Sequence, residues 1–244
     1  MKDIDFEKWD TLIQSDPLWY ISVLNDLGDL SELKEKENKN YRKLKVQVYD
    51  FFESHIRAND IVLGNVLRNW DAERIFIDTV LIHHTSHESG MNRDRLSAIE
   101  LIRLYAPYFK KPYDTEDSII KEKPIFSGHY RNGKQIFWPY HWIVRTDGSV
   151  ERLLEDNEIG WQAGNWDMNC RSIAITFDND YENGTPSDRE LDAAAKIVRE
   201  HYPKVSKDRI FGHREINLKT TCPSNLFLDT ESQKGWKNNL LQKI

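Results

Sequence analysis

The sequence predicts an α/β fold with a mixed central β-sheet flanked by helices, preceded by an N-terminal helical extension. Two patterns carry this prediction. From about residue 75 onward, segments with strand character alternate with amphipathic helical segments, which is typical of a sheet covered by helices. The first 70 residues contain apolar positions at helical spacing. We therefore expect the extension at residues 1–72 and the α/β domain at residues 73–244.

Three helices are expected in the extension. The first includes Phe6, and a third covers residues 46–56. The second follows Asp16-Pro17, because an acidic cap and a proline at the first helical position favour a helix start; its apolar positions are Trp19, Val23, Leu24 and Leu27. The strongly charged residues 32–45 predict a solvated face or a linker. No catalytic constellation is visible here, so a packing role is favoured over a binding role.

The α/β domain should contain several strands where apolar and β-branched residues gather. The expected strands are residues 75–82, 136–144, 150–154 and 172–178, the second and third joined by the turn Thr146-Asp147-Gly148. Expected helices are residues 96–109 and 187–201, the latter capped by Ser187. The polar segment from about residue 110 to 134 predicts a long loop or insertion, which in a compact domain is often functional.

Composition excludes some classes of protein. Of the 244 residues, 39% are hydrophobic and 30% charged, as in ordinary globular proteins. The net charge of −6 provides no basic field for a nucleic-acid partner. No apolar run reaches the length of a membrane span, and the first residues lack the apolar core of a secretory signal. We expect a cytoplasmic protein, or one that reaches the cell wall by a route other than a classical signal peptide.

Three residues are candidate metal ligands: His83, His213 and Cys222. His83 follows a predicted buried strand, and His213 and Cys222 lie nine residues apart. Imidazole and thiolate suit zinc, and a catalytic zinc has three protein ligands with a fourth position open to water. His84 would point to the opposite face if the strand continues, so it is the alternative first ligand rather than an additional one.

Five motifs in a fixed order carry a resemblance to a known family. They are Ile-His-His-Thr, Tyr-His-Trp-Ile-Val-Arg-Thr-Asp-Gly-Ser-Val, Gly-Trp-Gln-Ala-Gly-Asn, Arg-Ser-Ile-Ala-Ile, and Gly-His-Arg-Glu-Ile-Asn followed by Cys-Pro. This order resembles the type 2 N-acetylmuramoyl-L-alanine amidases, which include phage lysins and peptidoglycan recognition proteins. The resemblance covers roughly residues 75–227 and leaves the helical extension outside.

The resemblance implies a zinc enzyme that acts on bacterial cell walls. It places the zinc ligands at His83, His213 and Cys222, and it implies hydrolysis of the amide between N-acetylmuramic acid and L-alanine. The expected partner is peptidoglycan or a soluble muropeptide. Family members that only bind peptidoglycan commonly lack one ligand, so the complete set favours an enzyme.

The resemblance also implies groups that assist the chemistry. Tyr140 matches the family's catalytic tyrosine, and strand alternation would place it on the same face as Trp142. The family often has a lysine or threonine two residues before its third ligand. That position is Thr220 here, and Lys219 stands one residue further away in a slightly longer interval. Either residue is a candidate second donor.

Two positions depart from the family pattern. Some relatives carry a catalytic glutamate where this chain has Thr176, with Asp178 two residues on. Gln162 stands where relatives often have histidine, and we expect it to alter substrate contacts rather than the metal. The predicted substrate-binding residues are His84, Trp161, Gln162 and Asn169.

Three other functions compete with the amidase. A peptidoglycan-binding module without turnover would bind little zinc or release no product. A zinc amidase acting on a non-wall amide would have a groove reshaped by residues 110–134. A purely structural zinc site would need a fourth protein ligand, which His87 or His129 would have to supply.

Overall fold

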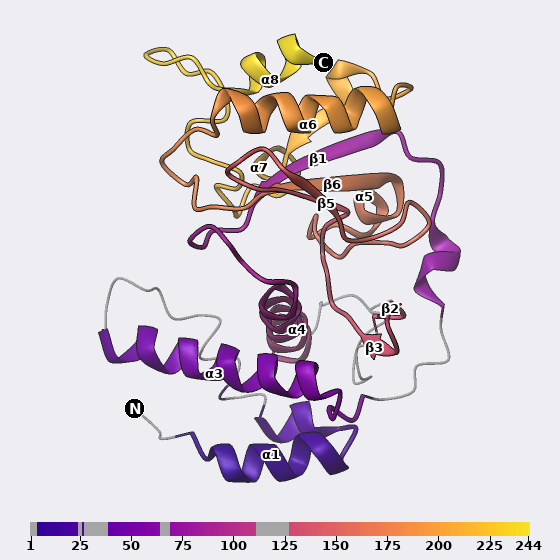
Figure 1. The fold of residues 1–244 in the computed structure, drawn as a ribbon, viewed down its shortest axis with the longest axis vertical. Helices are drawn as coiled ribbons and strands as arrows, with labels where there is room; N and C mark the ends of the chain where they lie inside the picture. The colour runs from indigo at the N-terminus through magenta and orange to yellow at the C-terminus, as the bar shows by residue number, and fades with distance from the viewer. Residues whose placement is uncertain (1–3, 24–25, 27–38, 64–68, 111–126) are drawn as a thin grey trace. The chain divides into compact units, whose positions relative to one another are not determined.

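The computed structural model describes residues 4–23, 26, 39–63, 69–110 and 127–244 (Figure 1). Its contacts divide the chain into two compact units. Unit 1 takes in residues 1–69 and 92–137, and unit 2 takes in residues 70–91 and 138–244. This grouping places a segment from the middle of the chain with the N-terminal residues. The predicted division at residue 72 remains a prediction.

Unit 1 is mainly helical. Its helices are α1 (Phe6–Ser15), α3 (Lys39–Ala58) and α4 (Arg93–Lys110), and a short hairpin joins β2 (Tyr130–Arg131) to β3 (Lys134–Gln135). Asp5 caps α1 by accepting a hydrogen bond from the Lys8 amide. Buried aromatic and aliphatic side chains fill this unit: Trp9, Ile13, Trp19, Tyr20 and Phe52. The predicted helices around Phe6, at residues 46–56 and at residues 96–109 are confirmed.

Other predictions for this part of the chain need correction or lie outside the described residues. Of the charged stretch at residues 32–45, predicted to be a solvated face or a linker, residues 39–45 form the first two turns of α3 and are therefore not a linker. Residues 32–38 lie outside the described residues. Residues 19–23 are helical as predicted, whereas Leu24 and Leu27 lie outside the described residues. Of the predicted insertion, residues 111–126 are likewise outside them, and residues 130–135 form the hairpin.

Unit 2 contains a five-stranded mixed sheet of order β5-β4-β6-β1-β7. The strands are β1 (Thr79–His84), β4 (Trp142–Val144), β5 (Val150–Arg152), β6 (Ser172–Phe177) and β7 (Ile210–Gly212). β4, β6, β1 and β7 run parallel to one another, and β5 pairs antiparallel with β4 at one edge. The predicted fold class, α/β with a mixed central sheet flanked by helices, is confirmed.

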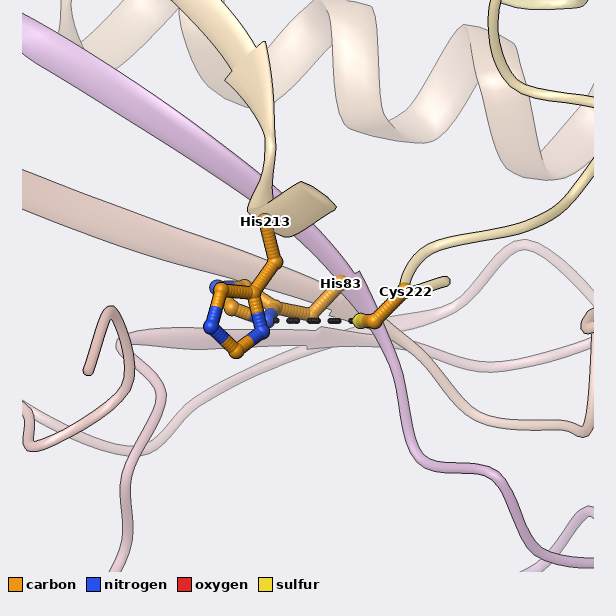
Figure 2. Close-up of side chains that lie close together, drawn as sticks. All are labelled: His83, His213 and Cys222. Carbon is orange, nitrogen blue, oxygen red and sulfur yellow. Dashed lines mark hydrogen bonds between the residues drawn. The ribbon is translucent and has the colours of Figure 1, made fainter. Parts of the chain in front are cut away.

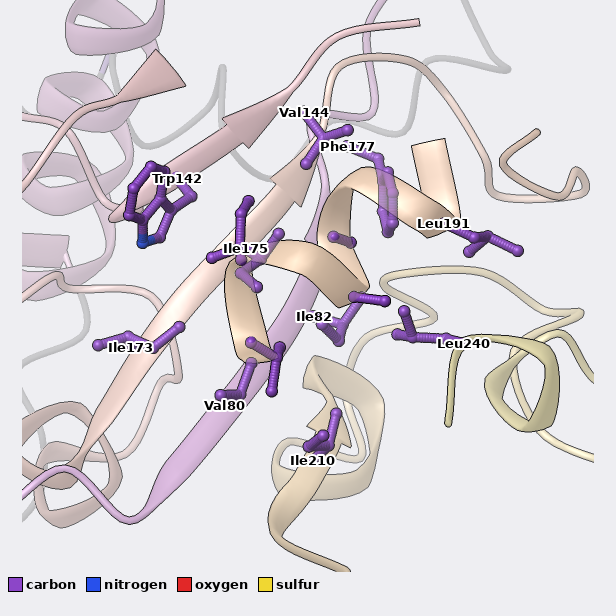
Figure 3. Packing of buried hydrophobic residues seen from close by; sticks show 14 of the residues in the cluster. Val80, Ile82, Trp142, Val144, Ile173, Ile175, Phe177, Leu191, Ile210 and Leu240 are labelled. Atoms are coloured by element: carbon purple, nitrogen blue, oxygen red, sulfur yellow. The ribbon is translucent and has the colours of Figure 1, made fainter. Parts of the chain in front are cut away.

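The helix α6 (Asp188–His201) covers one face of this sheet. Ser187 and Glu190 form a reciprocal capping box at its start, so the predicted cap is confirmed. Apolar side chains from the strands pack against α6 and α8 (Lys237–Lys243) in one buried cluster, which includes Val80, Ile82, Ile175, Phe177, Leu191 and Leu240 (Figure 3). Burial of such residues is the main favourable contribution to folding.

Short helical segments complete unit 2. They are η1 (Trp70–Glu73), α5 (Trp166–Arg171), η2 (Lys207–Arg209) and α7 (His213–Ile216). The predicted turn at residues 146–148 is confirmed, since Gly148 adopts φ +82° and its amide donates to the Arg145 carbonyl. In the described part of the chain, no helix combines the length and apolar character needed to cross a membrane.

All four predicted strands are shorter than expected, and the first two differ most. The first begins at Thr79 rather than residue 75, and Ile75 and Phe76 are exposed. The reason is that residues 75–78 lie beside α5 rather than beside a strand. The amides of Ile75 and Asp78 donate to the Cys170 and Arg171 carbonyls of that helix, so the regular ladder with β6 begins only at Thr79. The strand predicted at residues 136–144 is only Trp142–Val144, because Pro139 has no amide hydrogen to donate to a sheet.

Candidate metal centre

His83, His213 and Cys222 lie together at one edge of the sheet (Figure 2). Their ligand atoms all lie within 4.8 Å of one another. The Cys222 Sγ is 3.6 Å from the His83 Nδ1, and the two imidazole centroids are 4.8 Å apart. His83 and Cys222 are buried, and His213 is half-buried. The sequence-predicted ligand set is therefore brought together in space.

The sheet places the two histidines beside each other. β1 and β7 are parallel, with Ile82 opposite Gly212. His83 and His213 each follow that pair, so both emerge at the carboxyl edge of the sheet, where ligand sites of open α/β sheets commonly lie. Gly212 is required here, because a Cβ atom on it would lie 2.5 Å from the Phe227 ring and 2.7 Å from Pro223.

Hydrogen bonds within residues 213–224 bring Cys222 to the same point. The Arg214 amide donates to the Cys222 carbonyl at 2.7 Å, and the Arg214 guanidinium donates to the Ser224 carbonyl at 2.8 Å. The Thr220 Oγ1 accepts a hydrogen bond from the Cys222 amide at 3.1 Å. These bonds fold residues 213–224 into a loop that turns the cysteine toward the two histidines.

The donor set fits a zinc ion. Two imidazole nitrogens and a sulfur are ligands that zinc accepts, and ligand atoms around a tetrahedral zinc lie roughly 3.3–3.8 Å apart. The 3.6 Å separation between His83 and Cys222 falls within this range. His87 and His129 are not part of the cluster found among the described residues, so no fourth protein ligand of a structural site is seen there.

The other cysteine has a different environment. Cys170 is buried at the end of α5 and is not in the cluster. Burial raises the pKa of the Cys170 thiol to about 11, so it stays protonated near neutral pH. A protonated thiol is a poor metal ligand, and Cys170 therefore serves as a natural comparison for Cys222.

His84, the alternative ligand, lies elsewhere. Its Nδ1 accepts from the Tyr181 amide at 2.8 Å, and its Nε2 shares a hydrogen bond with the Ser86 hydroxyl. The cluster contains His83 and not His84, as strand alternation predicts for adjacent residues. A substrate contact of the buried His84 ring remains a prediction.

Gln162 lies against a proposed ligand rather than in an open groove. It is buried, and its Oε1 is 2.6 Å from the His83 Nε2. A role of Gln162 in substrate contacts remains a prediction. Sequence reasoning also missed Ser172, whose hydroxyl binds the Gln162 amide at 2.9 Å. Ser172 lies within the Arg-Ser-Ile motif, which was the available signal.

Two other predicted substrate residues, Asn169 and Trp161, lie next to Gln162. Asn169 is buried, and its Oδ1 accepts hydrogen bonds from the amides of Gln162 and Ala163. Trp161 is half-buried and packs edge-on against Trp70 and at a tilt against Trp166, with centroids 5.5 and 4.8 Å away. Both residues hold the loop at residues 160–165, and their substrate contacts remain predictions.

Tyr140 lies next to the cluster. Its ring centroid is 5.0 Å from that of His83, and the side chain is 6% exposed. Trp142 belongs to the buried cluster under α6, where its indole donates to the Tyr202 hydroxyl. The two residues therefore do not share a face as predicted, because the chain is not a strand at Tyr140 and regular alternation begins only at Trp142.

Lys219 and Thr220 differ in their surroundings. Lys219 is exposed, and its amide donates to the Asn217 side chain. Thr220 is half-buried and shapes the Cys222 loop through its hydroxyl. Neither belongs to the ligand cluster, and a donor role for either remains a prediction.

Thr176 stands where some relatives carry a catalytic glutamate, and the structure places it beside the proposed metal site. Thr176 pairs in register with His83, so its buried side chain lies beside the ligand on the neighbouring strand. Asp178 does not replace that glutamate, because its carboxylate binds the Arg145 guanidinium at 2.7 Å and the Gly90 amide at 2.8 Å. These bonds tie down the segment that follows β1.

The chain matches the N-acetylmuramoyl-L-alanine amidase family over residues 72–225, more than half its length, and it belongs to that family. The match includes every predicted site residue. A similar curated protein is the 1,6-anhydro-N-acetylmuramyl-L-alanine amidase AmpD of Haemophilus influenzae, 26% identical over 99 residues. That alignment covers 37% of this chain and 54% of AmpD, so the chain spans about half the length of the curated relative it matches.

Solved structures of two kinds resemble the chain. The N-acetylmuramoyl-L-alanine amidase LysC from Clostridium intestinale is 16% identical, with 64% of this chain and 80% of that chain covered at a TM-score of 0.44. The Drosophila peptidoglycan recognition protein SD is also 16% identical, with 62% and 78% covered and a TM-score of 0.44.

Proposed function

We propose that this protein is a zinc-dependent N-acetylmuramoyl-L-alanine amidase that cleaves the amide between N-acetylmuramic acid and L-alanine. The observation that supports this most is the cluster of His83, His213 and Cys222, within 4.8 Å, in a chain of the amidase family. Three ligands leave a fourth position for water or substrate, which is the arrangement of catalytic rather than structural zinc.

Each residue near the cluster has a proposed role in hydrolysis. His83, His213 and Cys222 would hold the zinc, which would lower the pKa of a water molecule and polarise the scissile carbonyl. Tyr140 donates a hydrogen bond to the oxygen that becomes negatively charged as the carbonyl is attacked. The departing amine needs a proton, and Lys219 or Thr220 is the proposed group that assists this step.

The proposed substrates are intact peptidoglycan and its soluble muropeptides. AmpD is named for an anhydro-muropeptide, so anhydro fragments belong in the first substrate panel. His84, Trp161 and Asn169 are proposed substrate-binding residues. Neither zinc nor the substrate requires a nucleic-acid partner, and the net charge of −6 agrees with this.

The first test combines zinc content with release of stem peptide. We expect about one zinc per chain and release of peptide from at least one substrate in the panel. His83→Ala and Cys222→Ser should lose zinc and activity together, because each removes one of three ligands. The matched controls are His201→Ala and Cys170→Ser, which make the same changes outside the cluster and should keep both.

Other results would change the assignment. Zinc without peptide release would favour a peptidoglycan-binding module or an amidase for a non-wall amide. Absence of zinc from carefully handled protein, with activity that survives a chelator, would overturn the proposal. Equal losses in His201→Ala and His83→Ala would also contradict it, since only His83 is a proposed ligand.

A further inference from the structure

A buried line of hydrogen bonds runs from His83 into the core of unit 2. The His83 Nε2 is 2.6 Å from the Gln162 Oε1. The Gln162 Nε2 donates to the Ser172 Oγ at 2.9 Å, and the Ser172 hydroxyl donates to the Met168 carbonyl at 2.6 Å. His83, Gln162 and Ser172 are each at most 6% exposed, so these bonds are shielded from water.

The Met168 carbonyl, at the far end of this chain of hydrogen bonds, determines which group donates and which accepts at each step. The Met168 carbonyl can only accept, so the single hydroxyl hydrogen of Ser172 is used there. The Ser172 oxygen must therefore accept from Gln162, which places the amide nitrogen toward Ser172 and the amide oxygen toward His83. An amide oxygen accepts hydrogen bonds and cannot donate them.

This order selects one form of the His83 ring. Because the Gln162 oxygen accepts, the hydrogen of the neutral imidazole belongs on Nε2, and Nδ1 carries the lone pair. Nδ1 is the atom that lies 3.6 Å from the Cys222 Sγ, inside the ligand cluster. The His83 ring is thus oriented with its Nδ1 lone pair toward the proposed metal position.

The backbone of Gln162 is held independently of its side chain. The amides of Gln162 and Ala163 donate to the Asn169 Oδ1 at 3.2 and 2.8 Å. Both ends of the Gln162 side-chain amide are engaged, and the residue is 6% exposed. A side chain in this state is better suited to orienting a neighbour than to reading a substrate.

We propose that Gln162 is a positioning residue that orients His83 for metal binding through Nδ1, with Ser172 fixing the orientation of the Gln162 amide. The inference rests on the proposed function only in taking zinc as the metal. Partners that bind the second nitrogen of a metal-ligating histidine are known to change metal affinity by about 10–100-fold.

The test measures zinc affinity and the form of the histidine ring, both independently of hydrolysis. Gln162→Leu removes the acceptor and keeps a similar volume. The matched control is Gln135→Leu in the β2–β3 hairpin, which removes another glutamine–serine hydrogen bond, to Ser127 at 3.0 Å. Zinc affinity is measured by competition with a chromophoric chelator, and nitrogen NMR of the metal-free proteins reports which His83 nitrogen carries the hydrogen.

We expect the wild type to hold the hydrogen on Nε2. Gln162→Leu should show a mixture of the two forms and weaken zinc binding about 10–100-fold. Ser172→Ala should change the zinc affinity and the position of the His83 hydrogen in the same direction but by a smaller factor. Without the Ser172 hydroxyl, the Gln162 side-chain amide can rotate and exchange the positions of its oxygen and nitrogen. Gln135→Leu should match the wild type. Comparable unfolding midpoints of the metal-free proteins would separate these effects from misfolding.

Unchanged zinc affinity in Gln162→Leu, with the hydrogen still on Nε2, would overturn the inference. So would an equal loss in Gln135→Leu, or a wild type that binds no zinc. A wild type that binds zinc with the expected glutamine dependence but releases no peptide would contradict the proposed amidase activity and leave this inference standing.

Discussion

Tyr140 reaches the proposed metal site from an irregular segment of chain. Pro139 cannot take part in a sheet ladder as a donor, and regular strand structure begins two residues after Tyr140. The segment is nevertheless held closely, because Gly160 packs directly against the Pro139 carbonyl and leaves no room for a Cβ atom. A residue without side chain at position 160 therefore helps to fix the backbone that carries the tyrosine.

Replacing Tyr140 by phenylalanine should separate metal binding from catalysis. The phenyl ring keeps the packing against His83, so zinc content and the unfolding midpoint should remain those of the wild type. Loss of the hydroxyl removes a donor for the developing oxyanion, which lowers kcat by about 10²–10³-fold in comparable cases. Steady-state kinetics on the best muropeptide, with zinc analysis of the same samples, measures this. Full activity in Tyr140→Phe would remove Tyr140 from the mechanism.

The sequence predicted individual site residues with uneven success. His83, His213 and Cys222 were predicted as one group, because their residue types and motif order are constrained by the metal chemistry. The role of Gln162 could not be predicted in the same way. Its bond to His83 joins residues 79 apart and depends on a loop that Asn169 holds in place, and no local pattern encodes such a contact.

At the scale of elements, one carboxylate joins the starts of three neighbouring strands. Asp78 directly precedes β1 and binds Arg171, which precedes β6, and Arg209, which precedes β7. It also accepts from the Thr79 hydroxyl at 2.7 Å. The Arg171 hydrogen bond, with those of Thr79 and Arg209, holds the pKa of Asp78 well below its usual range.

Asp78→Asn should destabilise unit 2 at neutral pH by about 2 kcal/mol, as expected for charge-assisted hydrogen bonds. Because the folded-state pKa is lowered, this stabilisation is present above the unfolded pKa of about 4 and is lost as the pH falls through the folded value. The difference between wild type and variant should therefore be constant from pH 5 to 8 and shrink below about pH 4.

Urea unfolding across this pH range measures the Asp78 effect. The control is Asp192→Asn, since Asp192 is exposed and makes a surface ion pair with Lys243 on α8. Such pairs contribute about 0–1 kcal/mol, so this variant should stay near the wild type. A stability difference for Asp78→Asn that grows as the pH falls would contradict the assignment.

Elements were easiest to predict where their signals are local. Ser187 and Glu190 mark the start of α6, and the structure contains the full capping box. Strand ends were harder, because a strand extends only as far as its neighbour. Residues 75–78 have β-rich composition but face the region where α5 replaces a pairing strand. The N-terminal end of β1 is therefore determined by tertiary structure, and composition alone places it too early in the sequence.

For the molecule as a whole, the distribution of the proposed ligands between the two units matters. His83, His213 and Cys222 all belong to unit 2, although 139 residues separate His83 from Cys222 in the sequence. A metal held by such distant segments would bind the folded unit much more tightly than the unfolded chain. It should therefore stabilise that unit by RT ln(1 + [Zn]/Kd), about 4 kcal/mol at a thousandfold excess over Kd.

Removal of zinc with a chelator should consequently loosen one unit more than the other. We expect faster amide hydrogen exchange in β1, β7 and residues 213–223, where the ligands and their supporting hydrogen bonds lie. Exchange in α1 and α3 should change little, because these helices belong to unit 1 and supply no proposed ligand. Mass spectrometry of peptides from zinc-loaded and chelated protein measures exchange in both units at once. The control is Cys222→Ser, in which the chelator should cause no change.

An equal increase in exchange in both units would mean that they unfold together and that zinc stabilises the entire chain. No change in β1 or β7 would contradict the proposed ligands.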